Sequence, residues 1–204
     1  AALSFGGVTA LQFLRDRAKV RAGEKVLVIG ASGAVGSAAV QLAKSFGASV
    51  TGVCSSANLE LVKSIGADRV IDYATEDSIK SGDQYDIICD TIGVTSYTAC
   101  KDALRPGGRL LLVASGLAQV LEAGRKPNGK AVMAGTGNAT VEHLVFLREL
   151  AEAGLFKPVI DRRLPFAQIV EAHRRVDTGH KAGSVVILVS NDPDRSIALP
   201  GAAP

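Results

Sequence analysis

Residues 25–36 read KVLVIGASGAVG, an apolar run of strand length followed by a turn of small residues. The next segment, AAVQLAK at 38–44, has the apolar spacing of a helix. A strand, a glycine turn and a helix in this order direct backbone N–H groups and the positive end of the helix dipole at one point. Gly33 would let a pyrophosphate approach the backbone, and Gly36 would let helix and strand pack closely. The segment therefore predicts a site for a phosphate-bearing ligand, although Ala31 replaces the first glycine of the G-x-G-x-x-G pattern.

Strand and helix patterns alternate on both sides of this segment. Strand patterns occupy residues 25–29, 49–53, 69–71, 85–89 and 109–113, with a shorter candidate at 130–133 and a final apolar run at 184–189. Helical patterns occupy residues 9–19, 38–46, 59–65, 95–104, 142–153 and 166–177. Such alternation predicts an α/β fold with right-handed crossovers. We expect a Rossmann-type, doubly wound parallel sheet of about six strands in the order 3-2-1-4-5-6.

The length and composition fit one such domain. The chain has 204 residues and is 47% hydrophobic, which is enough apolar material for a sheet buried on both faces. We expect this domain to span residues 1–190. Residues 191–204 contain two Asp, three Pro and a Gly, and are expected to form a disordered tail. No apolar run approaches the roughly 20 residues that span a membrane, so no membrane partner is expected.

Charge and cysteine usage exclude several classes of function. The net charge is only +3, the basic residues are scattered and aromatic residues make up 4%, which argues against a nucleic-acid partner. Cys54, Cys89 and Cys100 are isolated, with no zinc-ligand or disulfide spacing. They are expected to be buried thiols of a protein in a reducing compartment, the cytoplasm. The three histidines are unclustered, so neither a metal site nor a catalytic residue is assigned.

Several ordered motifs carry a resemblance to a known family. They are FGGVTA at 5–10, GASGAVG at 30–36, GAD at 66–68 with IDY at 71–73, DTIG at 90–93, LRPGGR at 104–109, PVID at 158–161 and GHKAG at 179–183. From residue 5 to 189, the chain resembles the nucleotide-binding half of the medium-chain dehydrogenase/reductases. Within them it is most similar to the zinc-independent, quinone-oxidoreductase-like branch.

The resemblance implies a larger protein. Members carry a GroES-like catalytic domain upstream, and this chain begins without methionine. We therefore expect it to be the cofactor-binding part of a two-domain oxidoreductase, whose targeting signal is unreadable here. By itself the chain is expected to bind the cofactor without turning over substrate.

The family pattern assigns residues to the adenosine half of a dinucleotide. Ser32, Gly33, Ala34 and Val35 would meet the pyrophosphate. Family members that prefer NAD place an acid after the second strand, but the stretch at 52–58, GVCSSAN, has none. The hydroxyl and amide donors of this stretch suit a 2′-phosphate, and a tyrosine further on would close on the same phosphate. NADP(H) is therefore expected over NAD(H). The residues are Ser55, Ser56, Asn58 and Tyr73. A plain strand-to-helix cap is the alternative role of the two serines.

The same pattern assigns residues toward the nicotinamide. Thr91 and Ile92 would flank the adenosine and ribose, and Ala114 and Ser115 would lie near the nicotinamide. The carboxamide side would be formed by Thr9, Thr136 and Gly137. Ordinary turn chemistry explains the last two equally well.

The implied reaction is hydride transfer between NADP(H) and a small-molecule substrate, a quinone, an enone or a related carbonyl. An enoyl-thioester reductase or an alcohol dehydrogenase of the same superfamily is the alternative enzyme. A methyltransferase is disfavoured by the missing acid after the second strand, and a non-catalytic dinucleotide sensor remains open. The apolar strand at 184–189 has no charge or proline to protect an edge, which predicts a homodimer through this strand.

Overall fold

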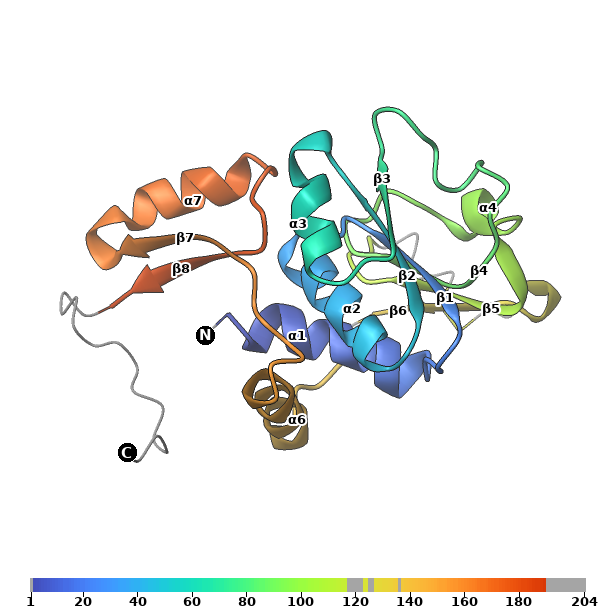
Figure 1. Cartoon of the computed structure of the whole chain (residues 1–204), viewed down its shortest axis with the longest axis horizontal. Helices are drawn as coiled ribbons and strands as arrows, with labels where there is room; N and C mark the ends of the chain where they lie inside the picture. The colour runs from blue at the N-terminus through green and yellow to red at the C-terminus, as the bar shows by residue number, and fades with distance from the viewer. Residues whose placement is uncertain (1, 117–122, 125–126, 136, 190–204) are drawn as a thin grey trace.

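A six-stranded parallel sheet forms the larger part of the molecule (Figure 1). The computed structural model describes residues 2–116, 123–124, 127–135 and 137–189. Every neighbouring pair of strands in this sheet is parallel. In spatial order the strands are β3 (Arg69–Asp72), β2 (Ser49–Cys54), β1 (Lys25–Ile29), β4 (Tyr85–Asp90), β5 (Leu104–Leu112) and β6 (Ala131–Ala134). The predicted α/β class and the order 3-2-1-4-5-6 are confirmed.

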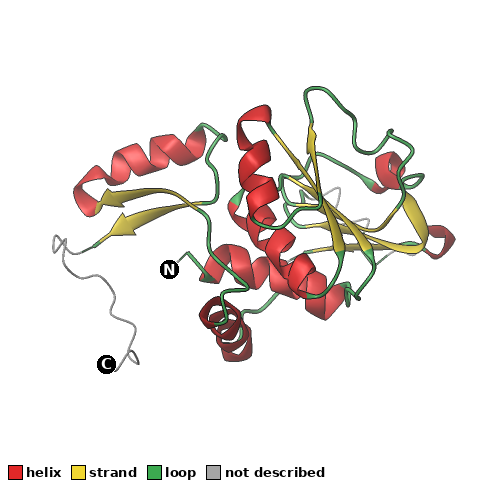
Figure 2. Ribbon diagram, viewed as in Figure 1, coloured by secondary structure: helices red, strands yellow, loops and turns green. Residues whose placement is uncertain are grey.

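Helices cover both faces of this sheet (Figure 2). One face packs against α1 (Ser4–Leu11), the π-helix η1 (Gln12–Arg17), α2 (Ala34–Ser45), α3 (Leu59–Ser64) and α6 (Val141–Glu152). The other face packs against the short helix α4 (Tyr97–Cys100). Alternate residues of β1 divide between the two cores: Val26 and Val28 join the first, and Leu27 and Ile29 join the second. Burial on both faces is why this strand is an uninterrupted apolar run.

A second unit stands apart from the six-stranded sheet in Figure 1. It consists of β7 (Ile160–Pro165), the 3₁₀-helix η4 (Phe166–Gln168), α7 (Ile169–Asp177) and β8 (Ser184–Leu188). Its two strands pair in parallel with each other. Between residues 157 and 189, Ala172 is the one apolar side chain that is buried. The apolar strand predicted at 184–189 therefore belongs to a small, thinly packed sheet of its own.

Two predicted helices differ from the structure. The helix expected at 95–104 is reduced to α4, because Leu104 already pairs with Tyr85 as the first residue of β5. The helix expected at 9–19 begins earlier, at Ser4, and continues as the π-helix η1. Two further 3₁₀ turns, η2 (Ser56–Asn58) and η3 (Pro127–Gly129), complete the described elements. The predicted tail at 191–204 lies outside the described residues.

The cysteines and one histidine have clear places in the fold. All three cysteines are buried, as expected. His143 is also buried, and its Nε2 lies 2.7 Å from an Asp16 carboxylate oxygen, which ties α6 to η1. None of the described helices is long and apolar enough to cross a membrane.

Candidate functional site

A cleft of about 700 Å³ opens at the carboxyl ends of the strands. It lies where the strand order reverses, since β1 has β2 on one side and β4 on the other. In open α/β sheets this switch point is where ligands bind. Six of the predicted cofactor residues line the cleft: Ser32, Gly33, Ser55, Asn58, Tyr73 and Ile92.

The turn after β1 requires glycine at two positions. Gly30 has a φ of +79°, and a Cβ there would come within 2.6 Å of Ile92 Cγ2. A Cβ on Gly36 would come within 2.0 Å of the Gly30 carbonyl oxygen. Since both contacts exclude any larger residue, the turn folds tightly against the first turn of α2. This is the close helix–strand packing that the sequence predicted for Gly36.

The N-terminus of α2 faces the ligand side of the turn. Gly33 is the N-cap residue, with φ −73° and ψ 176°, and no side chain caps the helix. Ala34 and Val35 are in its first turn and do not line the cleft, whereas Ser32 and Gly33 do. The positive end of a 12-residue helix is thus directed at the cleft, which favours a bound anion.

Polar side chains join the glycine turn to the end of β2. The Asn58 side-chain amide donates to Ser32 Oγ at 3.3 Å and to Ser55 Oγ at 3.2 Å. Ser55 is the N-cap residue of η2, but its side chain makes no capping hydrogen bond. Ser56 begins η2 and does not line the cleft. Tyr73, at the end of β3, is 62% exposed and closes this side of the cleft.

Asp90 shapes the loop after β4, and the sequence prediction gave it no role. Its carboxylate is completely buried and accepts hydrogen bonds from the backbone N–H groups of Ile92 (3.0 Å), Gly93 (2.8 Å) and Thr95 (2.8 Å). Thr91 Oγ1 turns inward and donates to the Ile29 carbonyl at 2.8 Å. Thr91 therefore braces the turn, and Ile92 is the residue that reaches the cleft. An acid at the end of an apolar strand, followed by TIG, is the sequence signal for this arrangement.

Of the residues predicted near the nicotinamide, Ala114, Ser115 and Gly137 follow strands at the same sheet edge but lie outside the cleft. Ala114 and Ser115 follow β5, and a Cβ on Gly93 would come within 2.3 Å of the Ala114 carbonyl oxygen. Gly137 follows β6 and lies against the Gln12 side chain. Thr9 is turned into its own helix, where Oγ1 donates to the Phe5 carbonyl at 2.8 Å. Thr136 lies outside the described residues.

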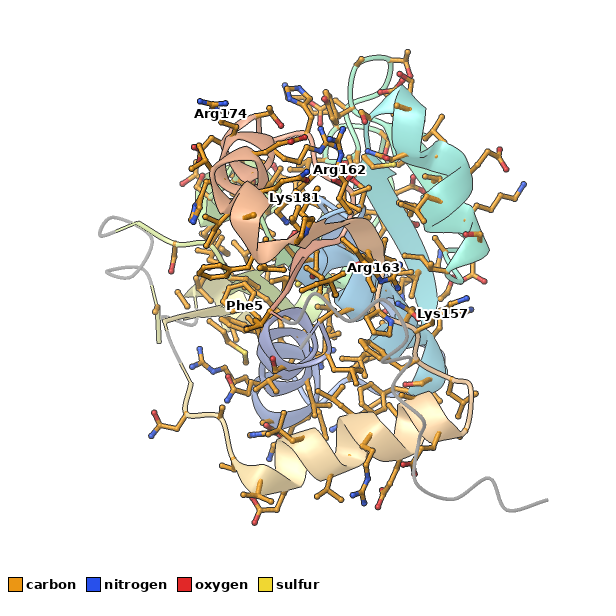
Figure 3. The ribbon with its side chains drawn as sticks, turned by 90° about the vertical axis from the view of Figure 1, so that its left-hand side faces the viewer. Phe5, Lys157, Arg162, Arg163, Arg174 and Lys181 are labelled. Carbon is orange, nitrogen blue, oxygen red and sulfur yellow. The ribbon has the colours of Figure 1, made fainter. Side chains whose placement is uncertain are left out.

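The β7–α7–β8 unit supplies a wall of the cleft that the sequence prediction missed. The lining residues from this unit are Asp161, Arg175, Gly179, His180, Lys181 and Ala182. Figure 3 labels Lys181 of this wall and Arg174, which lies on α7. The GHKAG motif at 179–183 was the available signal, but nothing in the local pattern shows which part of the fold it meets.

One thiol also reaches the cleft. Cys54 ends β2 and is buried, and this burial raises the pKa of its thiol to about 11, with Asp72 adding to the effect. The thiol is therefore protonated at neutral pH and is not a nucleophile. The described residues hold no group of three or more His, Cys, Asp or Glu that could bind a metal ion.

Comparison with known proteins gives consistent matches. A family model described as zinc-binding dehydrogenase matches residues 65–187. The mitochondrial NAD(P)H oxidoreductase RTN4IP1 of Mus musculus is 34% identical over 191 residues, covering 82% of this chain and 48% of that protein. The 2-methylene-furan-3-one reductase of Solanum lycopersicum is 36% identical over 191 residues, covering 92% and 46%. The chain spans about half the length of these relatives.

Solved structures agree with the sequence matches. The quinone oxidoreductase of Coxiella burnetii has a TM-score of 0.84 and 29% identity, covering 93% of this chain and 60% of that one. Together with the glycine turn and the strand order, these matches confirm the family inferred from the motifs. The chain belongs to the medium-chain dehydrogenase/reductases, in their zinc-independent, quinone-oxidoreductase-like branch, and carries their nucleotide-binding domain.

Proposed function

We propose that the cleft binds a nicotinamide dinucleotide, with NADP(H) preferred over NAD(H). Its volume of about 700 Å³ lies in the range of small-molecule and cofactor sites. The glycine turn and the N-terminus of α2 suit the pyrophosphate, and the Ser55–Asn58 side suits the adenosine ribose. The relative from Mus musculus is named as an NAD(P)H oxidoreductase, which supports the same class of ligand.

The observation that carries the NADP(H) preference is the chemistry at the end of β2. Ser55, Asn58 and Tyr73 present hydroxyl and amide groups to the cleft, and the loop after β2 contributes no carboxylate to its lining. Asp161 is the one carboxylate among the lining residues, and it is occupied by the Arg175 guanidinium at 2.7 and 2.8 Å. A carboxylate would repel a 2′-phosphate, whereas these donors can bind one.

The test is a comparison of NADPH and NADH binding to the wild type and two variants at Ser55. We expect the wild type to bind NADPH more tightly by about 1–3 kcal/mol, the range for hydrogen bonds to a charged group. Ser55→Asp should reverse the order, because it supplies a ribose acceptor and repels the phosphate. The neutral control, Ser55→Asn, should weaken NADPH binding without favouring NADH. Equal dissociation constants for the two cofactors in the wild type would contradict the preference.

We further propose that the whole protein is an oxidoreductase acting on a quinone, an enone or a related carbonyl. When bound, the nicotinamide supplies or accepts the hydride. The chain's own residues bind and orient the dinucleotide, and Ile92 and Val94 offer an apolar rim that is 53% and 68% exposed. Because this rim is open to solvent, the chain alone should bind the cofactor but should not position an acceptor molecule for hydride transfer.

The activity is tested by following the absorbance of NADPH during incubation with quinone and enone acceptors. The full-length protein should oxidise NADPH, and the 204-residue chain should stay at background. Oxidation of NADPH by an enoyl thioester alone, or reduction of NADP⁺ by an alcohol alone, would favour those alternative enzymes. Tight NADPH binding by the full-length protein, with no turnover on any acceptor, would favour a dinucleotide sensor.

A further inference from the structure

Lys181 is a partly buried cation in the wall of the cleft. It lies in the loop between α7 and β8 (Figure 3), and its Nζ donates to the Gly183 carbonyl at 2.7 Å. No ion pair joins its ammonium to a carboxylate of the described residues. Burial lowers the pKa of Lys181, which reflects the cost of removing its charge from water. An anion in the cleft would offset that cost.

The loop that carries Lys181 is attached to the glycine turn. The Gly183 N–H donates to the Ser32 carbonyl at 2.7 Å, and Gly33 and Gly183 form an isolated parallel β-bridge. The same Gly183 therefore accepts from the ammonium and donates to the turn. The loop that carries Lys181 is thus joined to the turn at the N-terminus of α2, and Lys181 lines the cleft from the wall opposite the strand ends.

A second cation in the wall holds the loop in place. Arg175 makes two hydrogen bonds to the Asp161 carboxylate, at 2.7 and 2.8 Å, and donates to the His180 carbonyl at 3.1 Å. The Ala182 N–H also donates to Asp161, at 3.0 Å. The charge of Arg175 is thus matched by Asp161, and its contacts fix both sides of Lys181. Asp161 also attracts the Lys181 ammonium, but its oxygens are hydrogen-bonded to Arg175 and Ala182, so the Lys181 charge has no ion pair within this cluster.

We propose that Lys181 binds the pyrophosphate of the dinucleotide, so that the β7–α7–β8 unit recognises the phosphates common to NADP(H) and NAD(H). This inference rests on the proposed function and names a further binding residue for it. Lys181 sets overall affinity, whereas the Ser55–Asn58 side of the cleft sets the choice between the two cofactors. The two roles are separable because Lys181 comes from the loop joined to the Ser32–Gly33 turn, whereas Ser55 and Asn58 follow β2.

The experiment compares Lys181→Met with Arg174→Met, which removes an exposed positive charge from α7 outside the cleft. Each variant is titrated with NADPH, NADH and 2′-AMP, the last of which has no pyrophosphate. Lys181→Met should weaken NADPH and NADH by the same factor, about 10- to 100-fold, the loss typical of a charged hydrogen bond. It should leave 2′-AMP unchanged, and Arg174→Met should change all three less than about twofold.

Several outcomes overturn the inference. If Lys181→Met weakens NADPH and 2′-AMP but spares NADH, the ammonium acts at the 2′-phosphate. If it changes none of the three while the wild type binds both cofactors, the inference fails and the proposed function stands. If the wild type binds neither dinucleotide, the proposed function fails first. Lys181→Arg keeps the charge and should retain binding, which separates loss of charge from loss of folding.

Discussion

The six-stranded sheet and the β7–α7–β8 unit both line the cleft, but they are held together by different means. The sheet is packed on both faces by large apolar side chains, among them Leu27, Ile87 and Leu111, that are completely buried. In the smaller unit, Ala172 is the one buried apolar side chain between residues 157 and 189. The sheet therefore supplies rigid geometry, and the smaller unit supplies charge on a more weakly packed frame.

Polar contacts join the two regions. Besides the Gly33–Gly183 bridge, the Gln41 side chain forms two hydrogen bonds to the backbone of Lys157, one as donor at 3.0 Å and one as acceptor at 2.7 Å. Such contacts stabilise modestly and depend on solvent. We therefore expect destabilising substitutions in the sheet to unfold the whole domain. Destabilising substitutions in the smaller unit should unfold only the wall of the cleft that it forms.

The largest effect is expected at the turn inside the sheet. Gly36→Ala should lower the free energy of unfolding by about 3 kcal/mol or more, because the new Cβ meets the Gly30 carbonyl oxygen at 2.0 Å. Gly33→Ala is the matched control. Its Cβ would lie 3.4 Å from the same atom at an ordinary φ of −73°, so the cost should stay below about 1 kcal/mol.

Chemical denaturation measures both variants, and an NADPH titration adds a second readout. Gly33→Ala should keep the fold yet weaken NADPH binding, because the methyl group stands where the pyrophosphate would approach. Equal losses of stability in the two variants would show that the tight turn does not depend on Gly36.

A smaller and more local effect is expected from Asp161→Asn. The change leaves Arg175 without its carboxylate and should cost about 2 kcal/mol of local stability in the β7–α7–β8 unit. Amide hydrogen exchange should quicken in residues 160–188 and stay unchanged in β1 and β4. The control is Glu171→Gln, which breaks an exposed pair with Arg162 at 3.5 Å and should cost less than about 0.5 kcal/mol. Faster exchange in β1 would show that the two regions unfold together.

The same ion pair predicts a dependence on pH. Arg175 holds the pKa of the Asp161 carboxyl at about 2, below its ordinary 3.8. Because the pKa is lower in the folded state, the stabilisation is complete above about pH 4 and is lost as the pH falls toward 2. Hydrogen exchange between pH 5 and 2.5 should show the β7–α7–β8 unit losing about 1–2 kcal/mol of protection. Asp161→Asn should show no such added loss.

The substitution expected to affect the stability of the single chain least is at the edge of the small sheet, where its effect should be on the oligomeric state. We propose that β8 joins a second copy of the chain, since it pairs with β7 on one side, and Leu188 and Val189 are 45% and 84% exposed. Ile187→Lys should convert a dimer to a monomer in light scattering. Val170→Lys, on an exposed position of α7, adds the same charge and should leave the dimer intact. A wild type that is monomeric at all concentrations would rule the dimer out.

The fold of the sheet could be predicted because its signals are local. The central strands β1 and β4 are short, largely apolar runs that end in a turn, and the GASGAVG turn marks where strand becomes helix. Where the local signal was ambiguous, the prediction was wrong. The 95–104 segment has helical spacing, but the pairing of Leu104 with Tyr85 decides its end. Within the helical pattern at 142–153, apolar spacing alone would place Leu144 in the core. It is 45% exposed, and its neighbour His143 is buried against Asp16 instead.

By itself, the sequence determined the α/β class and the glycine turn, because short-range periodicity and turn chemistry are written in consecutive residues. The resemblance of its motifs to a known family added the cleft residues that follow β2, β3 and β4. Only the tertiary structure decided that β8 leaves the large sheet, and that Asp161, Arg175 and Lys181 close the cleft. These residues lie far along the chain from Ser32, and a periodic pattern shows which residues are buried but not which distant partner covers them. The few hydrogen bonds around Gly183 join this loop to the glycine turn, and no local sequence pattern predicts them.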